Sequence, residues 1–164
     1  MTIDDSSPML SLTRRASAAG AADGRLVLPF ELRSKSRLRT VLETGEEVAI
    51  LLERGSVLRG GDRLLSEDGR IVEVLAAPER VSTVRAIDSW QLARVSYHLG
   101  NRHVALQIGA GWVRYQHDHV LDEMVRGLGF EVLVEEAAFE PEAGAYGGHA
   151  HGHAAGHDII RGVK

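Results

Sequence analysis

The sequence predicts an α+β protein with three parts: a small N-terminal all-β domain, a ferredoxin-like βαββαβ domain and a disordered C-terminal tail rich in histidine. Short apolar runs separated by glycines fill residues 24–76, which is typical of strands joined by turns. Strand and helix patterns alternate over residues 77–138, and periodicity then stops over residues 139–164. Residues 1–23 are rich in Ser, Ala and Gly, so we expect a flexible lead-in with one short strand at most.

The segment 24–76 shows strand patterns and no helix pattern. Strands are expected at 37–42 and 47–52, joined by a turn at 43–46. Asp68-Gly69 lies between two apolar runs, and this is a strong hairpin signal because Asp-Gly favours the tight turns that match the twist of paired strands. We therefore expect an all-β domain here and assign it a partner-binding role.

The segment 77–138 begins at a hinge-like Ala-Pro-Glu and continues as alternating strands and helices. Asp88 is expected to cap the first helix, with Gln91 in the reciprocal position of a capping box, and Asp118 is expected to cap the second. The resulting βαββαβ order places two helices on one face of a four-stranded sheet. The strands are expected at 81–86, 103–108, 112–116 and 132–134, and the helices at 88–99 and 118–128.

The composition argues against several classes of protein. Lys and Arg number 19 against 23 Asp and Glu, and neither half of the chain is basic enough to suggest nucleic acid as the main partner. There is no cysteine, which excludes disulfides and thiolate metal sites. No apolar run approaches the roughly 20 residues of a membrane-spanning helix, and Asp4 and Asp5 precede any apolar stretch, unlike a signal peptide. We expect a cytoplasmic protein that binds no membrane.

All eight histidines lie in the C-terminal half of the chain. Neutral imidazole is the commonest protein ligand for late transition metals, and a site without thiolates favours Ni(II), Cu(II), Zn(II) or Co(II). Four histidines stand in the low-complexity tail, where they can chelate a divalent ion in many registers with modest affinity, because the chain must be ordered on binding. These tail ligands are His149, His151, His153 and His157.

Three further candidate ligands lie in the folded part of the sequence. If residues 115–119 are extended, His117 and His119 point the same way, either as a metal-binding pair or as ordinary polar residues at a strand end. His103 stands in the loop after the first helix, and a twofold dimer would pair it with its own copy, because an isologous interface brings equivalent residues together. A site shared in this way is open and suited to metal that must be handed on.

Four cations recur at every second position in the N-terminal domain, so in an extended segment they would line one side. They form either a solvated strand face or a docking surface for an acidic protein partner. Phosphate binding is not supported, because Gly60-Gly61-Asp62 lacks the lysine and the spacing of a Walker loop. The four residues are Arg33, Lys35, Arg37 and Arg39.

Few features indicate catalysis. There is no nucleophile elbow, no His-Glu-x-x-His motif and no cysteine nucleophile, so we predict no catalytic residues and no enzyme. Asp122 and Glu123 lie in strongly charged sequence and are expected to be solvated. One alternative is a zinc-dependent hydrolase that uses His117, Asp118 and His119, although three close ligands with an activating base are not evident. Another is a histidine-based metal buffer with no delivery role.

Several segments together resemble the urease accessory nickel metallochaperone family, the UreE type. Gly100-Asn-Arg-His103 and His117-Asp-His119 form a specific combination, although neither would be specific alone. The family is also resembled by Arg-Gly-Ser-Val-Leu-Arg-Gly-Gly-Asp at 54–62, by the Arg-Ser-Lys-Ser-Arg run that begins at Arg33, and by Phe-Glu-Pro-Glu-Ala-Gly-Ala-Tyr at 139–146. The resemblance covers roughly residues 25–157.

The resemblance implies a non-catalytic homodimer with an N-terminal β domain and a ferredoxin-like metal-binding domain. It implies that His103 binds nickel at the dimer interface, one from each protomer, and that His117 and His119 form peripheral metal sites. The cargo would be Ni(II), delivered to the urease apoprotein with other urease accessory proteins including the GTPase; Cu(II) or Zn(II) can bind the same sites. Two positions depart from the family pattern: Ala105 replaces a frequent proline, and Gln116 stands where some relatives carry another histidine.

Overall fold

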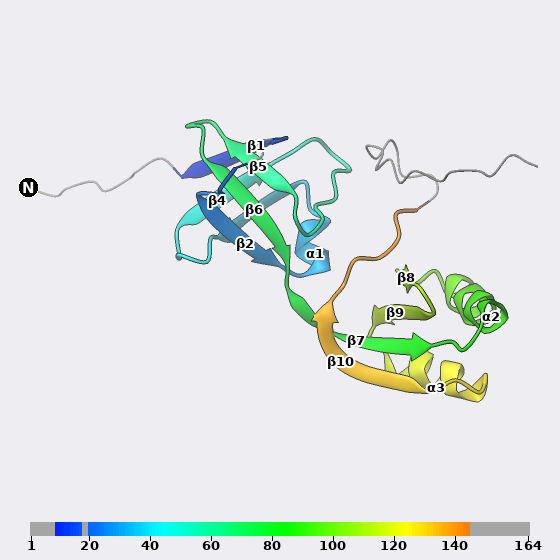
Figure 1. Ribbon diagram of the computed structural model, residues 1–164. Helices are drawn as coiled ribbons and strands as arrows, with labels where there is room; N and C mark the ends of the chain where they lie inside the picture. The colour runs from blue at the N-terminus through cyan, green and yellow to red at the C-terminus, as the bar shows by residue number, and fades with distance from the viewer. Residues whose placement is uncertain (1–8, 18–19, 145–164) are drawn as a thin grey trace, which may run out of the picture.

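The computed structural model describes residues 9–17 and 20–144 and contains two β-sheets joined by a single residue, Ala77 (Figure 1). The first sheet has six strands in the order β2-β6-β5-β1-β4-β3, and the second has four in the order β10-β7-β9-β8. The elements of the first part are β1 (Leu10–Arg15), β2 (Gly24–Leu28), α1 (Phe30–Arg33), β3 (Arg37–Val41), β4 (Glu47–Leu51), β5 (Arg63–Ser66) and β6 (Ile71–Ala76). Those of the second are β7 (Pro78–Arg85), α2 (Ser89–Gly100), β8 (Gln107–Gly109), β9 (Trp112–Gln116), α3 (His119–Gly127) and β10 (Val132–Ala138). No described helix is long and apolar enough to span a membrane.

Local patterns predicted much of the first sheet. The strands expected around the turn at 43–46 are β3 and β4, which pair antiparallel. The hairpin expected at Asp68-Gly69 joins β5 to β6, where Leu64 lies opposite Val72 and Gly69 has a φ of +90°, a conformation that glycine adopts without penalty. These predictions are confirmed. They could be made from the sequence because strand alternation and turn preferences depend on residues only a few positions apart.

The one short strand that was allowed within the lead-in over residues 1–23 is β1, but its place in the first sheet was not predicted. This strand lies inside the sheet, parallel to β4 and antiparallel to β5, and it buries Leu10 and Leu12. Leu10 lies opposite Val48, a partner far along the chain. The short pattern Leu-Ser-Leu-Thr, set among Ser and Ala, carries no local sign of that parallel pairing.

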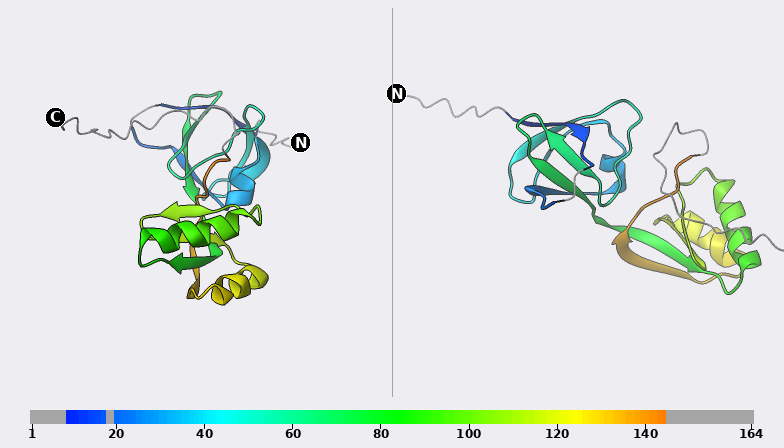
Figure 2. Two further views of the ribbon diagram at one scale, coloured as in Figure 1. Left: turned by 90° about the vertical axis from the view of Figure 1, so that its right-hand side faces the viewer. Right: turned by 45° about the horizontal axis from the view of Figure 1, so that its top comes forward.

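The six-stranded sheet encloses its own apolar core. One short helix, α1, cannot cover six strands, so the buried face is covered because the sheet curls round on itself (Figure 2). Alternate positions on the strands point inward, as the two-residue period of a strand requires. The core residues are Leu10, Leu12, Leu26, Leu28, Leu42, Val48, Ile50, Leu52, Leu58, Leu64, Val72 and Val74.

The basic run does not lie along one extended segment, so that part of the prediction is wrong. Arg33 ends α1 and is fully buried, whereas Arg37 and Arg39 lie on β3 and are exposed on either side of the half-buried Leu38. The Arg33 guanidinium donates from Nε to the Leu28 carbonyl at 3.0 Å and from Nη1 to the Leu58 carbonyl at 3.2 Å. A buried guanidinium needs such acceptors, because its donors cannot reach water.

Both helices of the second part pack on one face of its sheet. All neighbouring strands are antiparallel, and Val95 of α2 and Val125 of α3 join one buried cluster with Val84, Val113 and other residues. The cap predicted at Asp88 is confirmed: its carboxylate accepts from the Gln91 amide at 2.7 Å. The Gln91 side chain, however, accepts from the amide of Ile87 rather than that of Asp88.

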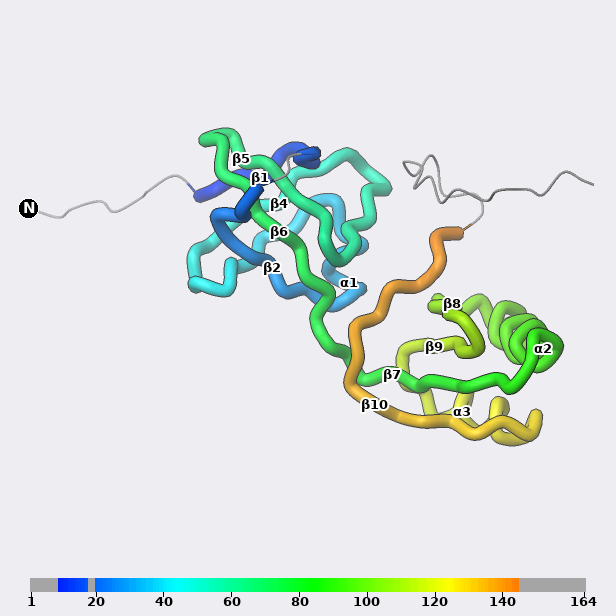
Figure 3. The backbone as a smooth tube through the Cα atoms, in the orientation of Figure 1, coloured from blue at the N-terminus to red at the C-terminus, as the bar shows by residue number. Residues whose placement is uncertain are grey.

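Polar contacts connect the two sheets across the expected hinge at residues 77–79, and we call this set of contacts the joint. The chain runs directly from β6 into β7, where Pro78 already pairs with Ala138 (Figure 3). After β10 the chain turns back beside α1, and Glu140 accepts from Arg33 Nη1 at 2.9 Å, from the Gly60 amide at 2.8 Å and from Arg59 at 3.3 Å. These contacts tie the end of the second sheet to the first.

Two more contacts complete this joint. Arg33 Nη2 donates to the Phe139 carbonyl at 2.5 Å, and the Phe139 ring meets the Phe30 ring edge-on with centroids 5.7 Å apart. On the other side of Ala77, Glu79 accepts from the Phe30 amide at 2.7 Å and from the Gln116 side chain at 3.1 Å. The joint therefore holds the two sheets together through residues that lie before and after Ala77 in the chain.

We predict that Arg33→Gln lowers the free energy of unfolding by on the order of 3 kcal/mol, because it leaves the acceptors of a buried guanidinium without their donors. The matched control Arg39→Gln, on an exposed position of β3, should change it by less than about 0.5 kcal/mol. Urea unfolding followed by circular dichroism measures both. Equal stability of the two variants would show that the buried guanidinium is dispensable.

Candidate functional site

His103 lies in an unusual turn at the end of α2. The helix ends at Gly100, and the Arg102 and His103 amides donate to the Leu99 and Gly100 carbonyls at 3.0 Å. His103 has a φ of +55°, and it is the only described residue other than glycine with a positive φ. That left-handed conformation is uncommon for a residue with a side chain, although histidine adopts it more often than most residues do. The turn leaves the His103 side chain exposed to solvent.

Large apolar side chains are also exposed on α2 and on β8. Trp90 is 67% exposed and Tyr97 is 66% exposed, and their seven-residue separation places them on the same face of α2. Ile108, on the edge strand β8, is 44% exposed. Large exposed apolar side chains of this kind can contribute to a surface that binds another protein.

His117 lies one residue beyond β9 and continues its pairing with β7, since its amide donates to the Arg80 carbonyl at 3.1 Å. Its ring is partly buried against two oxygens. Nδ1 lies 3.1 Å from Ser82 Oγ and 3.3 Å from Asp122 Oδ2. The side chain is 24% exposed, so one edge of the ring faces the interior and the rest reaches solvent.

Asp122 corrects the expectation that the carboxylates of α3 are solvated. Glu123 is exposed, but Asp122 is only 1% exposed and accepts a hydrogen bond from the Tyr115 hydroxyl at 2.8 Å. Burial raises the pKa of Tyr115 well above its ordinary value, and the hydrogen bond to Asp122 raises it further. The phenol therefore stays protonated and remains a donor. Arg126 Nη2 lies 3.8 Å from the same carboxylate.

The extended conformation that would align His117 with His119 stops at Asp118. The Asp118 carboxylate caps α3, accepting from the Val120 amide at 2.8 Å and from the Leu121 amide at 3.1 Å. The Leu121 amide, followed by that of Val120, holds the Asp118 pKa below its usual value. His119 is the first residue of the helix and is exposed. The prediction of the cap is confirmed, whereas the assumption of an extended segment through 119 is wrong.

The candidate ligands among the described residues, His103, His117 and His119, are not gathered into one centre. Within residues 9–17 and 20–144, no group of three or more His, Asp or Glu side chains could hold a metal ion. His98 instead packs its ring edge-on against Tyr97, with centroids 5.4 Å apart. The tail ligands His149, His151, His153 and His157 lie outside the described residues.

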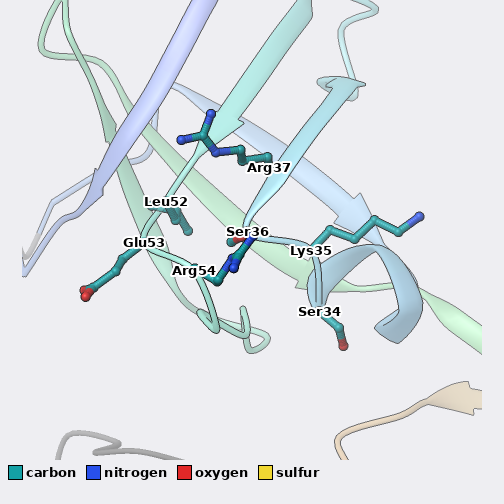
Figure 4. A pocket seen from close by; sticks show the side chains of 7 residues that line it. All are labelled: Ser34, Lys35, Ser36, Arg37, Leu52, Glu53 and Arg54. Carbon is teal, nitrogen blue, oxygen red and sulfur yellow. The ribbon is translucent and has the colours of Figure 1, made fainter.

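Lys35 and Arg37 of the basic run border a hollow on the first sheet (Figure 4). Lys35 Nζ lies 3.5 Å from Glu31 of α1, so this cation is partly neutralised. The hollow is lined by Ser34, Lys35, Ser36, Arg37, Leu52, Glu53 and Arg54. Arg54 is the cation that the sequence pattern missed, because it reaches this site from the loop after β4.

The sequence patterns also did not predict that Asp122 and Tyr115 lie beside His117. A signal was present: Asp122 lies three residues before Val125 and one after Leu121, on the apolar stripe of α3. A carboxylate on that stripe must be buried, and a buried carboxylate needs donors. Tyr115, two residues before His117 on the extended strand, supplies one.

Two family models match the chain. The N-terminal domain of the UreE urease accessory protein matches residues 11–77, and the C-terminal domain of the same protein matches residues 79–160. The two matches together span most of the sequence.

Curated relatives agree with these matches. The urease accessory protein UreE of Alkalilimnicola ehrlichii is 61% identical over 140 residues, covering 85% of this chain and 86% of the relative. Those of Pseudomonas putida strain GB-1 and Citrobacter koseri are 57% and 53% identical, covering 88% and 91% of this chain and 90% and 99% of the relatives. The class of protein is therefore that of the urease accessory proteins. The chain belongs to the UreE urease accessory protein family.

We predict that Tyr115→Phe lowers the free energy of unfolding by about 1–3 kcal/mol, because it removes the hydroxyl that donates to the buried Asp122. The matched control Tyr97→Phe alters a residue that is 66% exposed and should cost less than about 0.5 kcal/mol. Chemical denaturation at one fixed protein concentration measures both. Indifference of stability to Tyr115→Phe would rule out this hydrogen bond as a support of the site.

Proposed function

We propose that this protein is a nickel metallochaperone that binds Ni(II) through histidines and delivers it to apo-urease during active-site assembly. Other urease accessory proteins, including the GTPase, would take part in the delivery. The observation that carries the proposal is the exposed His103, held in a left-handed turn just beyond the end of α2. Membership of the UreE family supports the link to urease. Cu(II) and Zn(II) are expected to compete for the same imidazoles.

The carrier site requires a homodimer. A single protomer offers no group of three ligands among its described residues, so His103 needs ligands from a second copy. A twofold axis near the end of α2 would set the two His103 rings side by side. The exposure of Trp90, Tyr97 and Ile108 supports a dimer, because pairing through these side chains would remove apolar surface from water.

The remaining histidines would capture the ion. His117 and His119 form a peripheral site, and the tail ligands His149, His151, His153 and His157 collect Ni(II) from solution. Release to a partner would follow by ligand exchange at the open His103 pair. The zinc hydrolase and the metal buffer are less favoured; the carboxylate of Asp118, for example, is engaged in capping α3 and is a poor candidate base.

We also propose the roles of the parts. Residues 24–76, together with β1, would form the partner-binding domain, and Lys35, Arg37 and Arg39 would contact an acidic partner, whereas the buried Arg33 would not. Residues 77–138 would be a ferredoxin-like metal-binding domain; the order β10-β7-β9-β8 supports that class. The histidine-rich tail would begin later than residue 139, because Phe139 and Glu140, which were expected in an unpacked tail, pack against the first sheet. The protein would act in the cytoplasm and catalyse no reaction itself.

We predict that nickel titration calorimetry will find one tight Ni(II) per dimer in a full-length background whose four tail histidines are replaced by alanine. His103→Ala should abolish this binding, because neither protomer then supplies a ligand at the axis. The matched control His98→Ala removes an imidazole that packs on Tyr97 and should leave the tight site in place. One tight metal per monomer, indifferent to His103, would contradict the proposal.

A further inference from the structure

We infer that Asp122 is a positioning residue for His117: it keeps the proton on Nδ1 and so presents the Nε2 lone pair as the metal-binding atom. The inference rests on the proposed carriage of nickel, but its structural part concerns the metal-free protein. The observation behind it is the 3.3 Å separation between His117 Nδ1 and Asp122 Oδ2, beside the buried residues Ser82 and Tyr115.

The first step is the tautomer of His117. A carboxylate oxygen can only accept a hydrogen bond, so an unprotonated Nδ1 would place its lone pair against that of Asp122 Oδ2. A proton on Nδ1 removes this repulsion and can be shared with Ser82 Oγ at 3.1 Å. In the neutral ring the proton is then absent from Nε2, which is the form that binds a metal.

The second step is that Asp122 itself is fixed in place. It lies on the buried stripe of α3, Oδ1 accepts from the Tyr115 hydroxyl at 2.8 Å, and Oδ2 faces Arg126 at 3.8 Å as well as His117. Ser82 also interacts with Tyr115, so the polar groups form one connected cluster. No buried side-chain nitrogen or oxygen in the described part of the chain lacks a hydrogen-bond partner.

The third step is the effect on metal binding. Because Nδ1 faces the buried oxygens, Nε2 lies on the far side of the ring, and the side chain is 24% exposed. A carboxylate behind a metal-binding histidine fixes the ring and raises its basicity, and loss of such a partner typically costs 10–100-fold in metal affinity. His117 is therefore a preorganised ligand, whereas His119 begins α3 in an exposed position. The two histidines are not equivalent.

Asp122→Asn is the sharpest test because it keeps the shape of the side chain. The Tyr115 hydroxyl donates to Oδ1, so it should hold the amide oxygen there and turn the amide NH2 toward His117. Nδ1 would then accept and the ring proton would move to Nε2. The same exchange in the serine-protease triad stabilises the wrong tautomer while the geometry stays intact.

The experiment is long-range ¹H–¹⁵N NMR of the histidine rings in the metal-free full-length protein at about pH 8, above the usual imidazole range. We expect His117 to be the Nδ1–H tautomer in the unsubstituted protein and Nε2–H in Asp122→Asn. The matched control Asp118→Asn removes an equal charge next to His117 and keeps a good helix cap, so it should leave the tautomer unchanged. An Nε2–H tautomer in the unsubstituted protein, or no change in Asp122→Asn, would overturn the inference.

Nickel titration then tests the link to metal. In a background with His103 and the four tail histidines replaced by alanine, Asp122→Asn should weaken Ni(II) binding by about 10–100-fold. If the tautomer changes and the affinity does not, Asp122 does not position a ligand and the inference is wrong. If the background itself binds no Ni(II), the peripheral site in the proposed function fails, while the metal-free tautomer still decides whether Asp122 sets the ring.

Discussion

The buried guanidinium of Arg33 is the contact on which the arrangement of the two domains depends. It donates to carbonyls of the first sheet, at Leu28 and Leu58, and to Phe139 and Glu140 at the end of the second. Because these acceptors come from both sides of Ala77, the charge is satisfied only when the domains are docked. A single covalent link between two sheets would otherwise leave them free to turn. A partner that binds the first domain would therefore meet the candidate metal ligands at a defined position.

The two candidate ligands His117 and His103 are held in place in different ways. His117 lies against a buried carboxylate, which accepts a hydrogen bond from the hydroxyl of Tyr115, two residues earlier on β9. His103 is instead fixed by its backbone, in a turn that leaves the ring exposed. A ligand held only by its backbone can be completed by a second protomer and released again, which is what a carrier requires. The peripheral and shared sites thus suit different steps of the proposed transfer.

Local patterns predicted the elements better than they predicted long-range contacts. The β5–β6 hairpin and the caps at Asp88 and Asp118 were predictable, because turn chemistry and capping involve residues a few positions apart. The pairing of β1 was not predictable, since its parallel partner β4 lies far along the chain. Arg33 was assigned to a basic face because a period of two assumes an extended chain, whereas α1 turns it inward. The candidate metal ligands could be predicted from the sequence because they are histidines. The position of Asp122 beside His117 could be seen only in the folded structure.

The central claim is that one nickel site is built from the His103 of two protomers. The most direct test is a heterodimer that joins one protomer carrying His103 to one carrying His103→Ala, purified through two different tags, with the tail histidines of both replaced by alanine. A shared site predicts that this heterodimer binds no tight Ni(II), because one half of the ligand pair is missing. Retention of one tight Ni(II) per heterodimer would mean that each protomer carries its own complete site, and it would contradict the account.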